Sequence, residues 1–134
     1  MKKKLMIFGA GINQGSLIDV ANRMDITTIT IDPDPNAINK NKSDFHYLVG
    51  GDDYKQTKEI ALKHNIDGIA TTQMENPLRL MAKLGEELHL NFNSFSIIDQ
   101  SLDKWKMKKC FLANNIPCAN GIIFKQKEKI QKNK

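Results

Sequence analysis

The sequence lacks the long apolar run that a membrane-spanning helix requires. None of its 134 residues belongs to a run of about 18 apolar residues. Met1 and the three lysines after it are similar to the basic start of a signal peptide, but the apolar segment 5–8 is too short for its hydrophobic part. We therefore expect one globular chain in the cytoplasm, without a membrane partner.

Cysteine is also scarce. Cys110 and Cys118 are the only two, and no histidine lies near them. A zinc site needs a full set of ligands, usually in closely spaced pairs, and disulfides are rare in the cytosol. We expect two reduced thiols and no metal site.

A basic face is missing, although the formal net charge is +5. The last ten residues hold five lysines against one glutamate, and Lys2–Lys4 add three more, so residues 5–124 are slightly negative. Nucleic-acid binding needs basic residues gathered on one folded surface and interleaved with aromatic ones. We therefore expect no nucleic-acid partner.

Motifs of self-contained catalysts are absent as well. There is no G-x-S-x-G and no glycine-rich loop that ends in Lys-Ser or Lys-Thr. His46, His64 and His89 are scattered, without a carboxylate or nucleophile at a motif spacing. We assign no catalytic residue in this chain.

What the sequence does contain is an alternation of short apolar runs with helical periodicity. It predicts a Rossmann-like three-layer α/β sandwich with a mostly parallel sheet, in which the strand at 5–8 lies near the centre. Strands are expected at 5–8, 27–31, 45–49, 66–71 and 90–92. Helices are expected at 16–24, from a cap at Asp52 or Asp53 to 64, and at 95–100. A further helix would begin with Asn76 as its cap and Pro77 as its first residue, and run to 88.

The character of the chain changes after residue 100. Ser101 can cap a helix that runs to about Asn115, and 119–124 is expected to form a strand. The predicted organisation is a first domain at 1–100, the opening of a second at 101–124 and a disordered basic tail at 125–134.

The glycine-rich loop after the first strand is the main candidate for ligand binding. Gly9 and Gly11 let a ligand approach the main chain, and the following helix start offers N–H groups to an anion. The spacing to Gly15 is one residue longer than in the dinucleotide fingerprint. The alternative is a tight strand-to-helix turn with no ligand.

Two carboxylates follow other strands. Asp32 stands where a dinucleotide enzyme holds a ribose hydroxyl, but the Asp-Pro-Asp-Pro sequence favours local turn hydrogen bonds. Glu75 precedes a helix start, where it suits either a substrate amine or the helix dipole.

The order of these motifs resembles the ATP-grasp ligases. The motifs are the glycine loop, 29–37 (ITIDPDPNA), 65–69 (NIDGI), Glu75, and Asp103-Lys104 followed by 115–117 (NIP). The chain is similar, from residue 4 to about 124, to their N-terminal pre-ATP-grasp domain plus the first helix and strand of the ATP-grasp module. Biotin carboxylase, the carbamoyl-phosphate synthase large chain and the purine-pathway ligases are the nearest in pattern.

The resemblance implies roles for particular residues. Gly11, Asn13, Gln14, Gly15 and Glu75 would contact an acid- or phosphate-bearing substrate. Lys104 would contact ATP. Asn13 and Gln14 replace the acid that some purine-pathway members carry, so their substrate does not transfer.

The resemblance also implies the chemistry of a full-length parent. With ATP and Mg, the parent would activate a carboxylate as an acyl phosphate and join it to an amine or similar nucleophile. The second ATP lysine and the Mg-binding residues lie beyond this sequence, so we expect this chain alone to be inactive and to bind no cofactor tightly. Its partners would be the small acid and an ATP-grasp module, in cis or in trans.

The predicted function is therefore the N-terminal substrate-binding domain of an ATP-grasp carboxylate ligase. One alternative is a stand-alone Rossmann-like module for a small anion or nucleotide. Another is a fragment of a dinucleotide-dependent oxidoreductase, which the long loop and the Asp103-Lys104 helix disfavour. The oligomeric state, including a homodimer, stays open.

Overall fold

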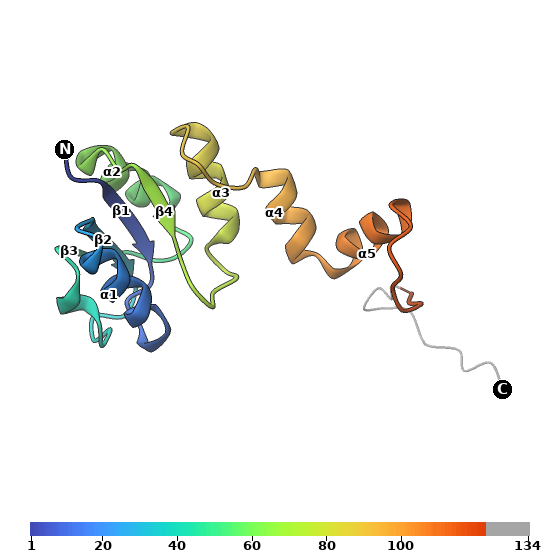
Figure 1. The fold of residues 1–134 in the computed structure, drawn as a ribbon, viewed down its shortest axis with the longest axis horizontal. Coiled ribbons are helices and arrows are strands. Elements are labelled where there is room, and N and C mark those ends of the chain that lie inside the picture. The colour runs from blue at the N-terminus through green and yellow to red at the C-terminus, as the bar shows by residue number, and fades with distance from the viewer. Residues whose placement is uncertain (123–134) are drawn as a thin grey trace. The chain divides into compact units, whose positions relative to one another are not determined.

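A parallel sheet forms the centre of the fold. The computed structural model describes residues 1–122. Its sheet has four strands in the order β3-β2-β1-β4, all parallel (Figure 1). The strands are β1 (Lys4–Phe8), β2 (Thr27–Asp32), β3 (Phe45–Leu48) and β4 (Gly68–Ala70). The predicted fold class and the central position of the first strand are confirmed.

Helices cover both faces of this sheet. The chain adds β2 and β3 on one side of β1 and then returns to add β4 on the other side. Right-handed crossovers therefore place α1 on one face of the sheet and α2 on the other. The described helices are α1 (Gly15–Arg23), α2 (Tyr54–His64), α3 (Leu78–Glu87), α4 (Phe95–Leu102) and α5 (Lys104–Ala113), with short 3₁₀ turns η1 (Ile12–Gln14) and η2 (Lys40–Lys42).

The alternation of side chains along the strands separates the two layers of the core. Met6 and Phe8 of β1 pack in one cluster with Met81 and Leu84 of α3. Ile7, between them in the sequence, is also buried but lies outside that cluster. Strands buried on both faces explain why β1 reads as a continuous apolar run.

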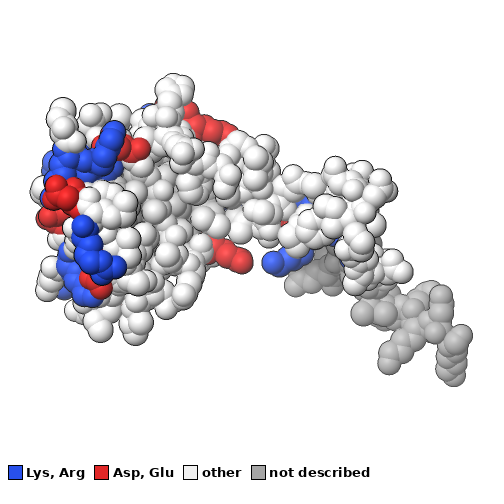
Figure 2. Space-filling model, in the orientation of Figure 1, with Lys and Arg blue, Asp and Glu red and all other residues white. Residues whose placement is uncertain are grey.

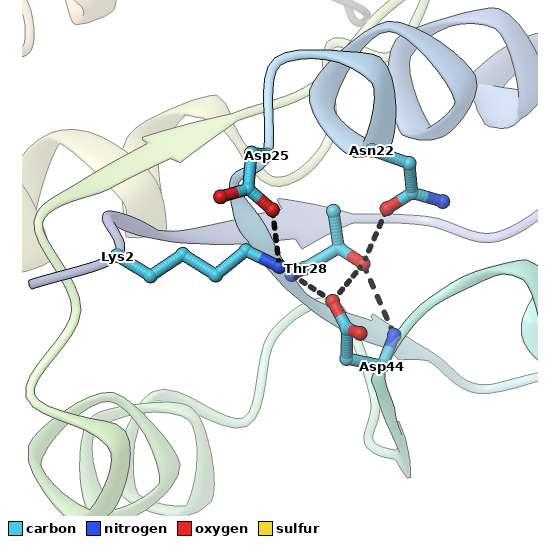
Figure 3. A network of polar contacts seen from close by, with 5 residues as sticks. All are labelled: Lys2, Asn22, Asp25, Thr28 and Asp44. Carbon is cyan, nitrogen blue, oxygen red and sulfur yellow. Dashed lines mark hydrogen bonds and ion pairs between the residues drawn. The ribbon is translucent and has the colours of Figure 1, made fainter.

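A polar network closes the amino end of the sheet (Figure 3). Thr28 of β2 is fully buried, and both its N–H and its hydroxyl donate to Asp44 Oδ2, at 2.8 and 3.1 Å. Asn22 Oδ1 lies 3.2 Å from the same hydroxyl. Lys2 pairs with Asp25 at the surface, and this hydrogen bond is the main cause of the raised pKa of Lys2. The network joins α1, β2 and the start of β3.

The surface of the described residues carries both signs of charge. Figure 2 shows basic and acidic side chains next to one another on the face in view, instead of a uniformly basic area. Among the ion pairs of the described residues is Lys42–Asp19, at 3.0 Å. In residues 1–122, no helix has both the length and the apolar composition to cross a membrane.

The fifth strand expected at 90–92 is wrong, because these residues form no strand in the structure. The N–H of Leu90 instead donates to the carbonyl of Gly85, at 2.8 Å, and His89 has a positive φ of 53°. This is the geometry of a helix C-terminus, in which the backbone turns to satisfy the last carbonyls of α3.

Two helix starts also differ from the prediction. Pro77, and not Asn76, is the N-cap of α3, without a side-chain cap. Asp103, and not Ser101, caps α5, because its Oδ1 accepts from the N–H groups of Trp105 and Lys106. Ser101 lies in α4.

The contacts divide the chain into two units. Met1–Asp99 forms the first, and Gln100 begins the second.

The strand expected at 119–124 is not formed by residues 119–122. Residues 123–124 of that strand and the predicted tail at 125–134 lie outside the described residues. Cys110 and Cys118 are free thiols.

Candidate functional site

Four loops meet at the carboxyl edge of the sheet. They follow β1 (residues 9–15), β2 (33–36), β3 (49–51) and β4 (71–75). Because all four strands are parallel, these loops share one edge, where open α/β sheets bind ligands. The four loops therefore lie along the same edge of the sheet.

Gly9 allows the chain to leave β1 sharply. Its φ is +94°, and its N–H donates to the carbonyl of Ile31 at 2.8 Å. A Cβ at this position would lie 2.9 Å from Gln14 Cδ and 2.9 Å from Met74 Sδ. Packing against Gln14 and Met74 therefore requires glycine at this position, whether or not a ligand binds.

Gln14 is a bridge between two of the loops. Its side chain is buried, and Nε2 donates to the carbonyl of Thr72 at 2.6 Å. In return, the Thr72 hydroxyl donates to the carbonyl of Asn13 at 2.8 Å. The structure thus gives Gln14 a structural role that the sequence did not predict.

Asn39 is a residue of the site that sequence reasoning missed. It is buried in the polar connection after β2, and its N–H and its Nδ2 donate to the carbonyls of Ala10 and Gly11, at 2.9 and 2.7 Å. A Cβ on Gly15 would lie 2.9 Å from Asn39 Nδ2. The connection has little periodicity, so no sequence signal singled out Asn39.

Asp32 is engaged in local backbone hydrogen bonds. Oδ2 accepts from the N–H of Ala10 at 2.7 Å, and Oδ1 accepts from the N–H of Asp34 at 2.8 Å. This agrees with the turn interpretation of Asp32, and it also ties the second loop to the glycine loop.

The other candidate residues of the glycine loop and Glu75 have polar groups that a ligand could contact. Asn13 and Glu75 are exposed, and Gly11 is half-buried. At the helix start, the N–H of Gln14 donates to the carbonyl of Gly11 at 3.2 Å, whereas the N–H groups of Ile12 and Asn13 have no acceptor in the preceding turn. Within residues 1–122, the Glu75 carboxylate forms no ion pair or side-chain hydrogen bond.

Lys104 belongs to the second unit. It is the first residue of α5, directly after the Asp103 cap, and its side chain is exposed. Groups of three or more His, Cys, Asp or Glu side chains suited to a metal ion do not occur in the described part of the chain.

Comparison with solved structures identifies ATP-grasp ligases. Phosphoribosylglycinamide synthetase from Anaerococcus prevotii has a TM-score of 0.77 and 26% identity over 86% of this chain and 30% of its own. N5-carboxyaminoimidazole synthetase from Staphylococcus aureus, complexed with ADP, has a TM-score of 0.68 and 18% identity over 86% and 31%. The biotin carboxylase subunit of pyruvate carboxylase has a TM-score of 0.64 and 21% identity over 87% and 28%.

The chain thus spans about 30% of the length of the ligases that it matches. Searches with protein-family models and with curated protein sequences give no match. The likeness lies in the fold more than in the sequence. It agrees with the resemblance to the N-terminal pre-ATP-grasp domain.

Proposed function

We propose that this chain, whose structural neighbours are ATP-grasp ligases, is the N-terminal part of such a ligase and binds its small acid substrate. The observation that carries the proposal is the convergence of the glycine loop and the 71–75 loop at one sheet edge, joined by Gln14 and Thr72. The acid would carry a carboxylate or a phosphate.

The helix start supplies the attraction for the anion. The N–H groups of Ile12 and Asn13 and the positive end of the η1–α1 segment together favour a negative charge. Asp32 and Asn39 each bind a backbone group of this loop, and Gln14 ties the loop to the carbonyl of Thr72. These bonds fix the conformation of the loop before a ligand arrives. A preformed loop loses less conformational entropy on binding.

Glu75 supplies the opposite charge. Its exposed carboxylate follows the 71–74 segment to which Gln14 is bound, and it can accept hydrogen bonds from a substrate amine. In the parent ligase, ATP would supply the phosphoryl group that activates a carboxylate. The residues of this chain would bind and orient the acid and contribute no proton transfer.

Amide mapping by NMR tests this function. Titration of the chain with O-phosphoserine, which carries a phosphate, a carboxylate and an amine, is expected to shift the amides of 11–15 most, with a millimolar dissociation constant. Glu75→Gln should weaken binding about fivefold, as for one exposed ion pair. Glu59→Gln, an exposed glutamate of α2, is the matched control and should leave the affinity unchanged.

Two outcomes would contradict the proposal. One is a set of largest shifts around Trp105 on α5, which would place the ligand on the second unit. The other is an equal loss of affinity in both glutamate variants, which would reduce the role of Glu75 to general surface charge.

A further inference from the structure

The first unit has an open cavity of about 290 Å³ that takes no residue from the glycine loop. It is lined by the start of α2, the first half of α3 and Phe95. Six of its lining residues determine its chemistry: Asp52, Tyr54, Arg79, Leu80, Lys83 and Phe95. Ligand cavities usually begin at about 300 Å³, so this one suits a molecule of about one ring.

Two cations of α3 line the same cavity. Arg79 and Lys83 are four residues apart, which places them on one side of the helix. Arg79 uses Nε for its 2.9 Å ion pair with Asp99, and this contact orients the guanidinium. Lys83 Nζ lies 4.2 Å from the centroid of the Tyr54 ring, so a cation–π contact holds the ammonium at the cavity wall.

The aromatic wall is fixed and neutral. The Tyr54 hydroxyl donates to Glu87, which also accepts from Lys58. Burial first, and then the hydrogen bond to Glu87, raises the pKa of Tyr54 to about 12. The ring therefore carries no charge at neutral pH and lines the cavity together with Leu80 and Phe95.

We propose that the cavity between α2 and α3 binds a small planar monoanion, such as an aromatic carboxylate. Arg79 is already paired with Asp99, whereas Lys83 forms no ion pair with another residue of 1–122, so Lys83 supplies the positive charge for a single carboxylate. The flat ring of the ligand would contact Tyr54, Leu80 and Phe95. The site is independent of the acid proposed for the glycine loop.

The pair benzoate and benzamide tests this site, because the two molecules share a shape and differ in charge. With the full chain, benzoate is expected to shift the amides of 52–54 and 79–83 and to bind about fivefold more tightly than benzamide, as for one exposed ion pair. Lys83→Met should abolish that preference without weakening benzamide. Lys55→Met removes an exposed lysine of α2 that does not line the cavity and should leave the preference intact.

Equal affinity of the two molecules would overturn the proposal, as would an unchanged preference in Lys83→Met. Benzoate shifts centred on 11–15 would overturn it too, since the acid would then occupy the glycine loop. The proposal for the glycine loop is tested with a different ligand, O-phosphoserine, and a different variant, Glu75→Gln. One proposal can therefore fail without the other.

Discussion

Replacing Gly9 with alanine is expected to lower the free energy of unfolding by about 3 kcal/mol. The φ of +94° is strained for any residue with a Cβ. The new Cβ would also lie 2.9 Å from Gln14 Cδ and from Met74 Sδ. Gln14 cannot move away without losing its hydrogen bond to Thr72, so strain and overpacking add.

Urea denaturation followed by circular dichroism measures this change. Gly51→Ala is the matched control, because a Cβ at Gly51 meets nothing within 4 Å and its φ lies outside the strained range. It should change the stability by less than about 0.5 kcal/mol. Similar losses in both variants would show that the packing around Gly9 is not what the structure describes.

Replacing Asp44 with alanine is expected to cost about 2 kcal/mol of folding free energy. Asp44 Oδ2 accepts from both the N–H and the hydroxyl of Thr28, which is fully buried (Figure 3). Without this carboxylate, the buried N–H loses its partner and pays its desolvation cost. Urea denaturation, as for Gly9, measures the loss.

Asp25→Asn tests the specificity of that effect. Asp25 belongs to the same network but pairs with Lys2 at the surface, where its side chain is 87% exposed. Asparagine tolerates the positive φ of 57° at this position. We expect a change of less than about 0.5 kcal/mol. If Asp25→Asn cost as much as Asp44→Ala, the buried bonds to Thr28 would not be the cause.

The sheet was predictable because its signals are local. β1 is a short apolar run that ends in glycine, and β2 is β-branched and ends before Pro33. Parallel strands alternating with helices leave few topologies, so the parallel sheet with a central first strand followed from the order of the elements. The resemblance to ATP-grasp ligases rested on the same order of motifs.

The contacts within the site were not predictable, because they join residues distant in the sequence. Gln14 reads as a candidate ligand-binding side chain, but its partner is the carbonyl of Thr72, far along the chain. Asn39 lies in a connection without periodicity, yet it holds Gly11 in place. Leu90 and Phe92 alternate with Asn91 as in a strand, whereas the N–H of Leu90 is used at the end of α3.

Isothermal titration with Mg-ATP tests most directly whether this chain is an acid-binding part of a ligase or a nucleotide module. Lys104 offers one exposed ion pair, worth about 1 kcal/mol or less, whereas millimolar binding needs about 4 kcal/mol. In residues 1–122, no three or more His, Cys, Asp or Glu side chains come together as a metal site. We predict a dissociation constant for Mg-ATP no tighter than about 1 mM. A micromolar constant would contradict the account and favour a self-sufficient nucleotide-binding module.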